Sequence, residues 1–102
     1  MSSLEELFAF QLKAHRIKFE REVRLDPSRR FRWDFVVGDL AIEVQGGQWR
    51  AKGAHNTGKA MGRDAEKGFI ALKAGFRPLS ITGDQVKSGV GLIWVESLMR
   101  TG

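Results

Sequence analysis

The 102-residue chain contains no cysteine, which excludes disulfides, thiolate zinc sites and cysteine nucleophiles. It also has no apolar run near the roughly 18 residues of a membrane-spanning helix, so we expect no membrane association. Internal repeats, low-complexity tracts and linkers rich in proline, glycine or serine are absent, which predicts one domain over residues 1–102. The lack of cysteine fits a reducing compartment, so we expect a cytoplasmic protein.

Hydrophobic residues make up 42% of the chain, which is typical of a folded domain. The formal net charge is +5, and the basic residues cluster, which favours a polyanionic partner over a generic basic surface. The two clusters are Arg21, Arg24, Arg29, Arg30 and Arg32, and Arg50, Lys52, Lys59, Arg63 and Lys67.

The hydrophobic pattern predicts a mixed α/β domain of order α-β-β-β-α-β-α, in which helices cover a central sheet. Turns are expected at Asp26-Pro27-Ser28 and Gly83-Asp84. The helices are expected at 3–16, 61–74 and 89–100, and the strands at 17–25, 31–37, 40–45 and 77–82.

The second predicted helix follows a long polar segment, residues 46–60, that is rich in glycine. Loops of this length in a small domain are usually functional or mobile. The helix itself is expected to turn Met61, Ala65, Phe69 and Leu72 toward the core.

The strands at 31–37 and 40–45 flank Gly38-Asp39, a favoured two-residue hairpin turn. If Val37 pairs with Leu40, counting back along the strands sets Asp34 opposite Glu43. Like charges in that position destabilise a sheet. Two readings remain open: a divalent cation lies between the carboxylates, or both lie on a solvated face and pair with arginines.

A metal site here would have oxygen ligands. Glu43 and Gln45 share one face of their strand, because side chains alternate along it. Two carboxylates, from Asp34 and Glu43, and the backbone carbonyl of Val44, completed by water, would suit Mg²⁺ (or Mn²⁺). Such a metal neutralises phosphate and lowers the pKa of bound water, so a basic protein with this site suggests phosphodiester hydrolysis.

Asp34, followed nine residues later by Glu43-Val44-Gln45, resembles the PD-(D/E)XK nuclease superfamily. Leu4-Glu5, Gln11-Leu12 and Ile17-Lys18-Phe19-Glu20 are similar to the start of phage Holliday-junction resolvases. Other segments resemble small nucleases of the very-short-patch-repair-like branch: 29–35, 41–47, His55, Asp64, Lys67 and Gly75-Phe76-Arg77.

The resemblance implies a three-layer restriction-endonuclease-like fold and metal-dependent hydrolysis of DNA, with Asp34 and Glu43 as metal ligands. Glu5 matches an additional acidic residue of some members, although it also fits charge stabilisation at a helix N-terminus. Gln45 departs from the family, because it stands where the signature lysine is expected. Glutamine can orient a water molecule but cannot neutralise charge.

Two further side chains are candidates for the site. Lys67 can bring an ammonium group from the second helix, or it can pair with Asp64 on a solvated helix face. His55, in the glycine-rich segment, can act as a general acid, contact phosphate or be merely solvated.

Basic residues around these candidates are expected to bind backbone phosphates, which positions DNA without reading its sequence. We therefore expect structure-selective cleavage of a Holliday junction, flap or other branched DNA. Two cuts on a branch suggest a homodimer, and the resemblance suggests a bacterial or phage-infected cell. The expected phosphate-binding residues are Arg29, Arg30, Arg32, Arg50, Lys52, Lys59 and Arg63.

Two alternative functions remain. A non-catalytic DNA-binding or accessory module would keep the nuclease fold but lose activity with the missing lysine. An RNA-directed nuclease or binder also fits, because clustered basic residues do not distinguish the two sugars.

Overall fold

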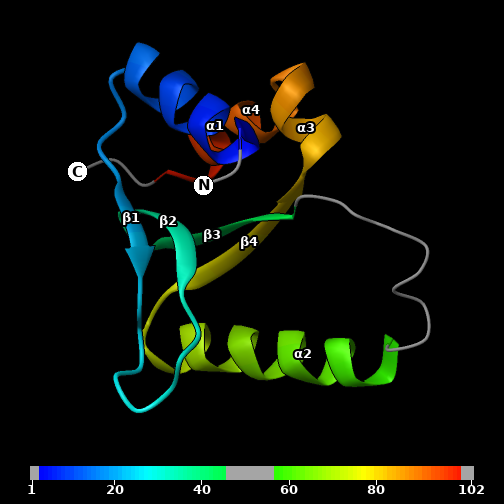
Figure 1. The fold of residues 1–102 in the computed structure, drawn as a ribbon. Coiled ribbons are helices and arrows are strands. Elements are labelled where there is room, and N and C mark those ends of the chain that lie inside the picture. The colour runs from blue at the N-terminus through cyan, green and yellow to red at the C-terminus, as the bar shows by residue number, and fades with distance from the viewer. Residues whose placement is uncertain (1–2, 46–56, 100–102) are drawn as a thin grey trace.

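The computed structural model describes the backbone of residues 3–45 and 57–99 and the side chains of residues 3–45 and 62–99. Its helices and strands follow the predicted order, which confirms the mixed α/β fold (Figure 1). In chain order they are α1 (Ser3–Ala14), β1 (Glu20–Val23), β2 (Trp33–Val37), β3 (Leu40–Gln45), α2 (Thr57–Lys73), β4 (Arg77–Thr82), α3 (Gly83–Ser88) and α4 (Val90–Leu98).

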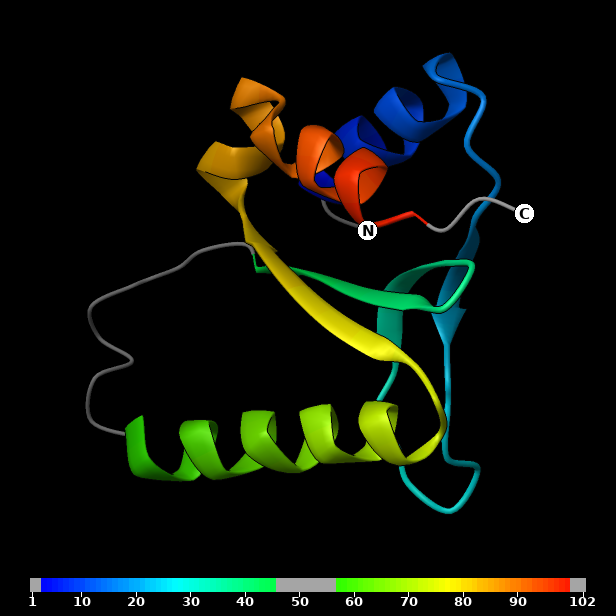
Figure 2. The same cartoon turned by 180° about the vertical axis from the view of Figure 1, so that it is seen from behind.

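The four strands form one sheet in the order β1-β2-β3-β4. The pairs β1–β2 and β2–β3 are antiparallel, whereas β3 and β4 are parallel and joined through α2. The sheet lies between two helical layers, with α1, α3 and α4 on one face and α2 on the other (Figures 1 and 2). No helix in the described part of the chain is long and apolar enough to cross a membrane.

Most of the apolar core lies between the sheet and the α1, α3 and α4 layer. Phe8 and Leu12 on α1 are fully buried, and the ring of Phe8 meets that of Phe35 edge-on at 5.2 Å between centroids. Helical spacing at residues 4, 8 and 12 produces this buried stripe, as the sequence predicts. A smaller cluster of Trp33, Ala41 and Ala71 lies on the α2 side of the sheet.

The β2–β3 hairpin has the predicted register, with Val37 opposite Leu40, Val36 opposite Ala41 and Phe35 opposite Ile42. Gly38 has a φ of 59°, a conformation that glycine adopts without steric cost. The next turn residue, Asp39, accepts two hydrogen bonds from the guanidinium of Arg77, at 2.6 and 3.0 Å. The turn is therefore held against the start of β4.

The predicted orientation of α2 is wrong. Phe69 and Leu72 are 61% and 62% exposed, and Ala65 is also exposed, whereas Ile70 and Ala71 are buried against the sheet. The side chain of Met61 lies outside the described residues. Helical periodicity identifies an apolar stripe, but it does not establish that this stripe packs against the core. Here α2 packs against the sheet through the face that carries Ile70 and Ala71.

Several predicted boundaries also differ. The helix α2 begins at Thr57, inside the segment 46–60 that was predicted to be a loop. Gly83-Asp84 is not a turn but the start of α3, which is preceded by a capping box between Thr82 and Gln85. Gly89, with a φ of 86°, then separates α3 from α4, so a short helix that was not predicted from the sequence comes before the expected last helix. The first strand is shorter than predicted and covers Glu20–Val23.

Candidate active site

The predicted carboxylates lie where β2 and β3 separate. The recorded pairing between the two strands ends at Phe35 and Ile42, one step before Asp34 and Glu43. Beyond this point the amide of Val44 donates a hydrogen bond to Oδ2 of Asp34, at 2.8 Å. The side chain of Asp34 thus takes the place of a backbone acceptor, and the bond fixes the direction of its carboxylate.

Asp34 is half-buried. Burial raises the pKa of its carboxyl above the ordinary value, and the nearby charge of Glu22 raises it further. The hydrogen bond from Val44 and the positive charges of Lys67 and Arg21 act against this rise. Burial is thus the main cause of the raised pKa of Asp34, and side chains with a perturbed pKa are enriched at functional sites.

Glu43 lies opposite α2 and pairs with Lys67, with 3.2 Å between Nζ and Oε2. The side chain of Lys67 is only 11% exposed, and its ammonium lies 4.7 Å from the centroid of the Trp33 ring. Lys67 shares the inward face of α2 with Ile70 and Ala71, which brings it to the sheet. The structure therefore pairs Lys67 with Glu43, and the solvated pair with Asp64 is not what it shows.

Glu5 approaches the same region from α1. Burial raises the pKa of Glu5, and the charge of Asp34 is the second cause. Arg21 on β1 lies 3.7 Å from Glu5 and 3.1 Å from Glu6, with its guanidinium 5.2 Å from the centroid of Phe35. Sequence reasoning counted Arg21 only among the clustered basic residues, because no local pattern reveals a pairing between strand and helix.

The structure describes only some of the remaining predicted site residues. Gln45 is exposed at the end of β3, opposite Thr82 on β4. Arg50, Lys52 and His55 lie outside the described residues, as does the side chain of Lys59. The structure thus brings together Asp34, Glu43, Glu5 and Lys67, and it leaves the roles predicted for Gln45 and His55 untested.

The donor set is suited to a small hard cation. Asp34 and Glu43 offer carboxylate oxygens, and the carbonyl of Val44 stays a predicted third ligand. In the described part of the chain, no group of three or more acidic, histidine or cysteine side chains gathers tightly enough to hold a metal. Mg²⁺ usually binds one or two carboxylates and keeps several waters, so two carboxylates fit its chemistry.

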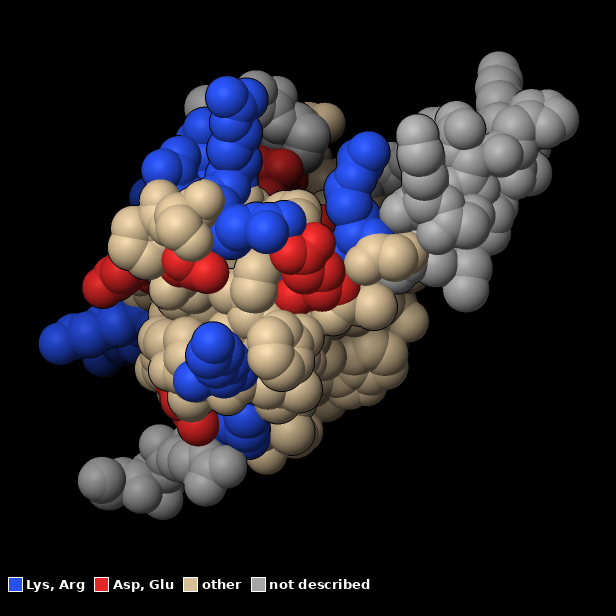
Figure 3. All heavy atoms as spheres, turned by 90° about the horizontal axis from the view of Figure 1, so that it is seen from below, with Lys and Arg blue, Asp and Glu red and all other residues tan. Residues whose placement is uncertain are grey.

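The arginines before β2 are exposed, but two of them already form ion pairs within the protein, so they are only partly available to bind phosphate. Arg29 pairs with Glu66 at 2.5 Å and Arg32 with Glu22 at 3.1 Å. Arg30 and Arg63 are also exposed. Viewed from the α2 side, basic side chains spread over this face with acidic ones between them (Figure 3). The predicted phosphate-binding arginines therefore lie at the surface on a face of mixed charge.

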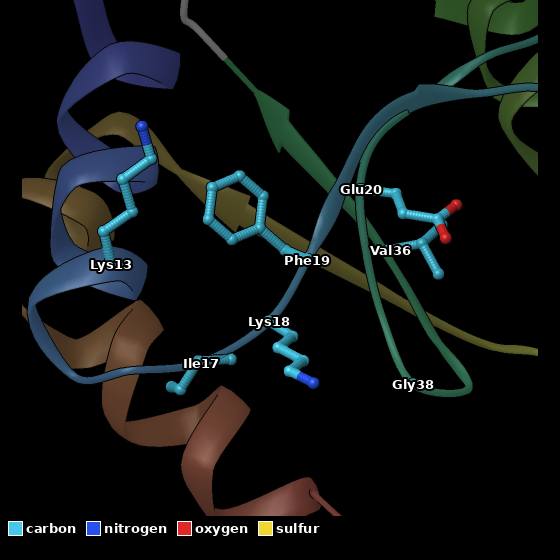
Figure 4. A pocket seen from close by; sticks show the side chains of 7 residues that line it. All are labelled: Lys13, Ile17, Lys18, Phe19, Glu20, Val36 and Gly38. Atoms are coloured by element: carbon cyan, nitrogen blue, oxygen red, sulfur yellow. The ribbon is translucent and has the colours of Figure 1, made fainter.

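A separate cavity of about 640 Å³ lies at the other end of β2, beside the hairpin turn (Figure 4). Its apolar side chains come from Ile17, Phe19 and Val36, and the ammonium groups of Lys13 and Lys18 point away from one another. None of the predicted site residues lines it, so it is distinct from the carboxylate site.

Neither a protein-family model nor a curated protein matches the chain. Among solved structures, it is similar to the catalytic domain of the homing endonuclease I-Bth0305I, with a TM-score of 0.65 and 24% sequence identity. The match covers 97% of this chain and 100% of that domain. The chain therefore has the fold of an endonuclease catalytic domain.

Proposed function

We propose that this protein is a metal-dependent DNA endonuclease of the PD-(D/E)XK superfamily. The observation that carries the proposal is the meeting of Asp34, Glu43 and Lys67 where β2 and β3 separate. The fold shared with a homing endonuclease catalytic domain supports the same reaction class. Asp34 and Glu43 are the proposed ligands of Mg²⁺ or Mn²⁺, with the Val44 carbonyl beside them.

A bound divalent cation in such a site would neutralise phosphate charge and lower the pKa of water. The protein's own part is positioning. The Val44 amide donates a hydrogen bond to Oδ2 of Asp34, which leaves Oδ1 of that carboxylate for the proposed cation. Lys67 holds Glu43 and places a positive charge at the site, and the amide of Gln45 orients the attacking water. The positive charge missing at Gln45 thus comes from α2.

Branched DNA, a Holliday junction or flap, is the proposed substrate. The surface arginines contact phosphates, and such contacts do not read bases. We propose cleavage guided by DNA shape, and Arg30→Ala should reduce the salt dependence of binding by about 0.9 in the log–log slope.

The test is cleavage of supercoiled, linear and four-way-junction DNA with Mg²⁺ or Mn²⁺. Asp34→Asn and Glu43→Gln should each lower the rate by roughly 100-fold or more, the scale of losing one catalytic electrostatic group. Asp84→Asn, at an exposed acid on α3, is the matched control and should cleave like the wild type.

A non-catalytic DNA-binding module is the second candidate, favoured by the glutamine at position 45. A wild type that binds DNA with a steep salt dependence, yet never cuts with either metal, would establish this alternative. Preferential cutting of RNA in the same assays would replace DNA as the substrate.

A further inference from the structure

The ammonium of Lys67 is held by an aromatic ring as well as by a carboxylate. It lies over the ring of Trp33, 4.7 Å from the centroid, and 3.2 Å from Oε2 of Glu43. Only 11% of the Lys67 side chain is exposed, so this long side chain is confined at the site. The face of an indole ring attracts a cation although the ring carries no charge.

The two contacts differ in what they leave of the positive charge. Glu43 neutralises the ammonium with which it pairs, and the same carboxylate is a proposed metal ligand. When Glu43 serves a cation, its hold on Lys67 weakens, whereas the neutral ring of Trp33 keeps its contact with the ammonium. The ring therefore holds Lys67 in place and leaves its charge available to a phosphate.

Trp33 is itself fixed on both sides of this contact. It lies on β2 directly before Asp34, pairs with Val23 on β1 and is only 3% exposed. The same side chain packs with Ala71, which lies one turn after Lys67 on the face of α2 that meets the sheet. The ring thus fixes the distance between α2 and the strand that carries the first carboxylate.

Hydrogen bonding does not explain a tryptophan at this position. Nε1 of Trp33 is buried and has no hydrogen-bond partner among the described residues. Buried indole N–H groups usually find a partner, and one without a partner lowers stability. Phenylalanine or leucine would fill an apolar cluster without that loss. The feature of tryptophan that this site uses is therefore the face of its ring.

We infer that Trp33 is a positioning residue, which holds the ammonium of Lys67 beside the carboxylates for the phosphate under attack. The inference rests on the proposed nuclease function and deepens it, because it names what fixes the charge that replaces the missing lysine. Trp33 acts through Lys67 and contacts neither DNA nor the cation. Its loss should therefore slow cleavage and leave the binding of DNA intact.

NMR spectroscopy of the full chain, without DNA or metal, tests the contact. The ring current of the indole should shift the ε-methylene protons of Lys67 upfield from those of the other lysines, and Lys67→Met identifies the signal by removing it. Trp33→Leu should return the signal to the ordinary position. Trp94→Leu, at a tryptophan on α4, is the matched control and should leave it unchanged. A wild type without an upfield lysine signal overturns the inference.

Cleavage kinetics test the role. With Mg²⁺ and a four-way junction, Trp33→Leu should lower the single-turnover rate at saturating protein by at least about tenfold, while the affinity for the DNA stays within about twofold. Trp33→Phe keeps a ring face without an N–H group and should retain most of the rate. Equal losses in the two variants would overturn the use of the ring face.

A double variant separates positioning from support of the fold. In the Lys67→Met background, Trp33→Leu should lower the rate by less than about twofold, because the ring has no ammonium left to hold. The same tenfold loss in both backgrounds would overturn the inference. If circular dichroism shows Trp33→Leu unfolded, Trp33→Met takes its place. A wild type that never cuts DNA, yet shows the upfield lysine signal, contradicts the proposed nuclease function and not the contact.

Discussion

The two faces of the sheet are built differently. The face under α1, α3 and α4 carries a continuous apolar core around Phe8, Phe35 and Ile42, all fully buried. The face under α2 carries a small cluster around Trp33 and a charged pair, Lys67 with Glu43. One face therefore supplies most of the stability. The other accommodates charge near the sheet, as a candidate active site requires.

The largest expected effect comes from the first face. Phe35→Ala removes a fully buried ring that packs on Phe8 and Phe19, and should lower the free energy of unfolding by about 3–5 kcal/mol. Phe69→Ala, at an exposed phenylalanine on α2, should change it by less than about 0.5 kcal/mol. Urea denaturation of the two variants at low concentration measures both. Equal losses would contradict the difference between the faces.

An intermediate effect is expected at the charged pair. Lys67→Met removes the partner of Glu43 and leaves a partly buried carboxylate unpaired, at a cost of about 1–3 kcal/mol. The Lys67→Met, Glu43→Gln double variant should recover part of this loss, and denaturation of all four proteins completes the cycle. Additive losses would show that the pair contributes no coupling.

The smallest expected effect is a gain in stability at Asp34. Folding raises the pKa of this carboxyl from 3.8, so its ionisation removes stability as the pH rises through and above that value. Asp34→Asn avoids this loss and should stabilise the fold slightly at neutral pH, because solvent screens much of the effect, with no gain below pH 3.8.

Asp26→Asn is the control with the opposite sign. Two hydrogen bonds from Ser28 lower the pKa of Asp26, so its ionised form favours the folded state. Asp26→Asn should therefore lose stability at neutral pH, and the loss should vanish in acid. Thermal denaturation across pH measures both variants, and a gain at both positions would contradict the role of burial at Asp34.

The sequence predicted those features of the fold that residues close together in the chain determine. Gly38-Asp39 sets the hairpin register, which led correctly to the neighbourhood of Asp34 and Glu43. The orientation of α2 was wrong, because two apolar faces compete and the packing of Ile70 on the sheet decides between them. The capping box at Thr82 and Gln85 was readable in the sequence, whereas the contacts of Arg21 with α1 depend on tertiary structure alone.

The contact between Arg77 and the hairpin turn has a consequence for the order of folding. Besides Asp39, its guanidinium donates to the carbonyl of Leu98 at 2.7 Å, so it joins the turn, β4 and the end of α4. A slip of one residue in the hairpin would turn both site carboxylates to the other face. We expect the register to become fixed only after β4 docks. Hydrogen exchange of the hairpin amides in a chain ending before Arg77 should therefore be fast, and slow exchange there would show that the hairpin is fixed without it.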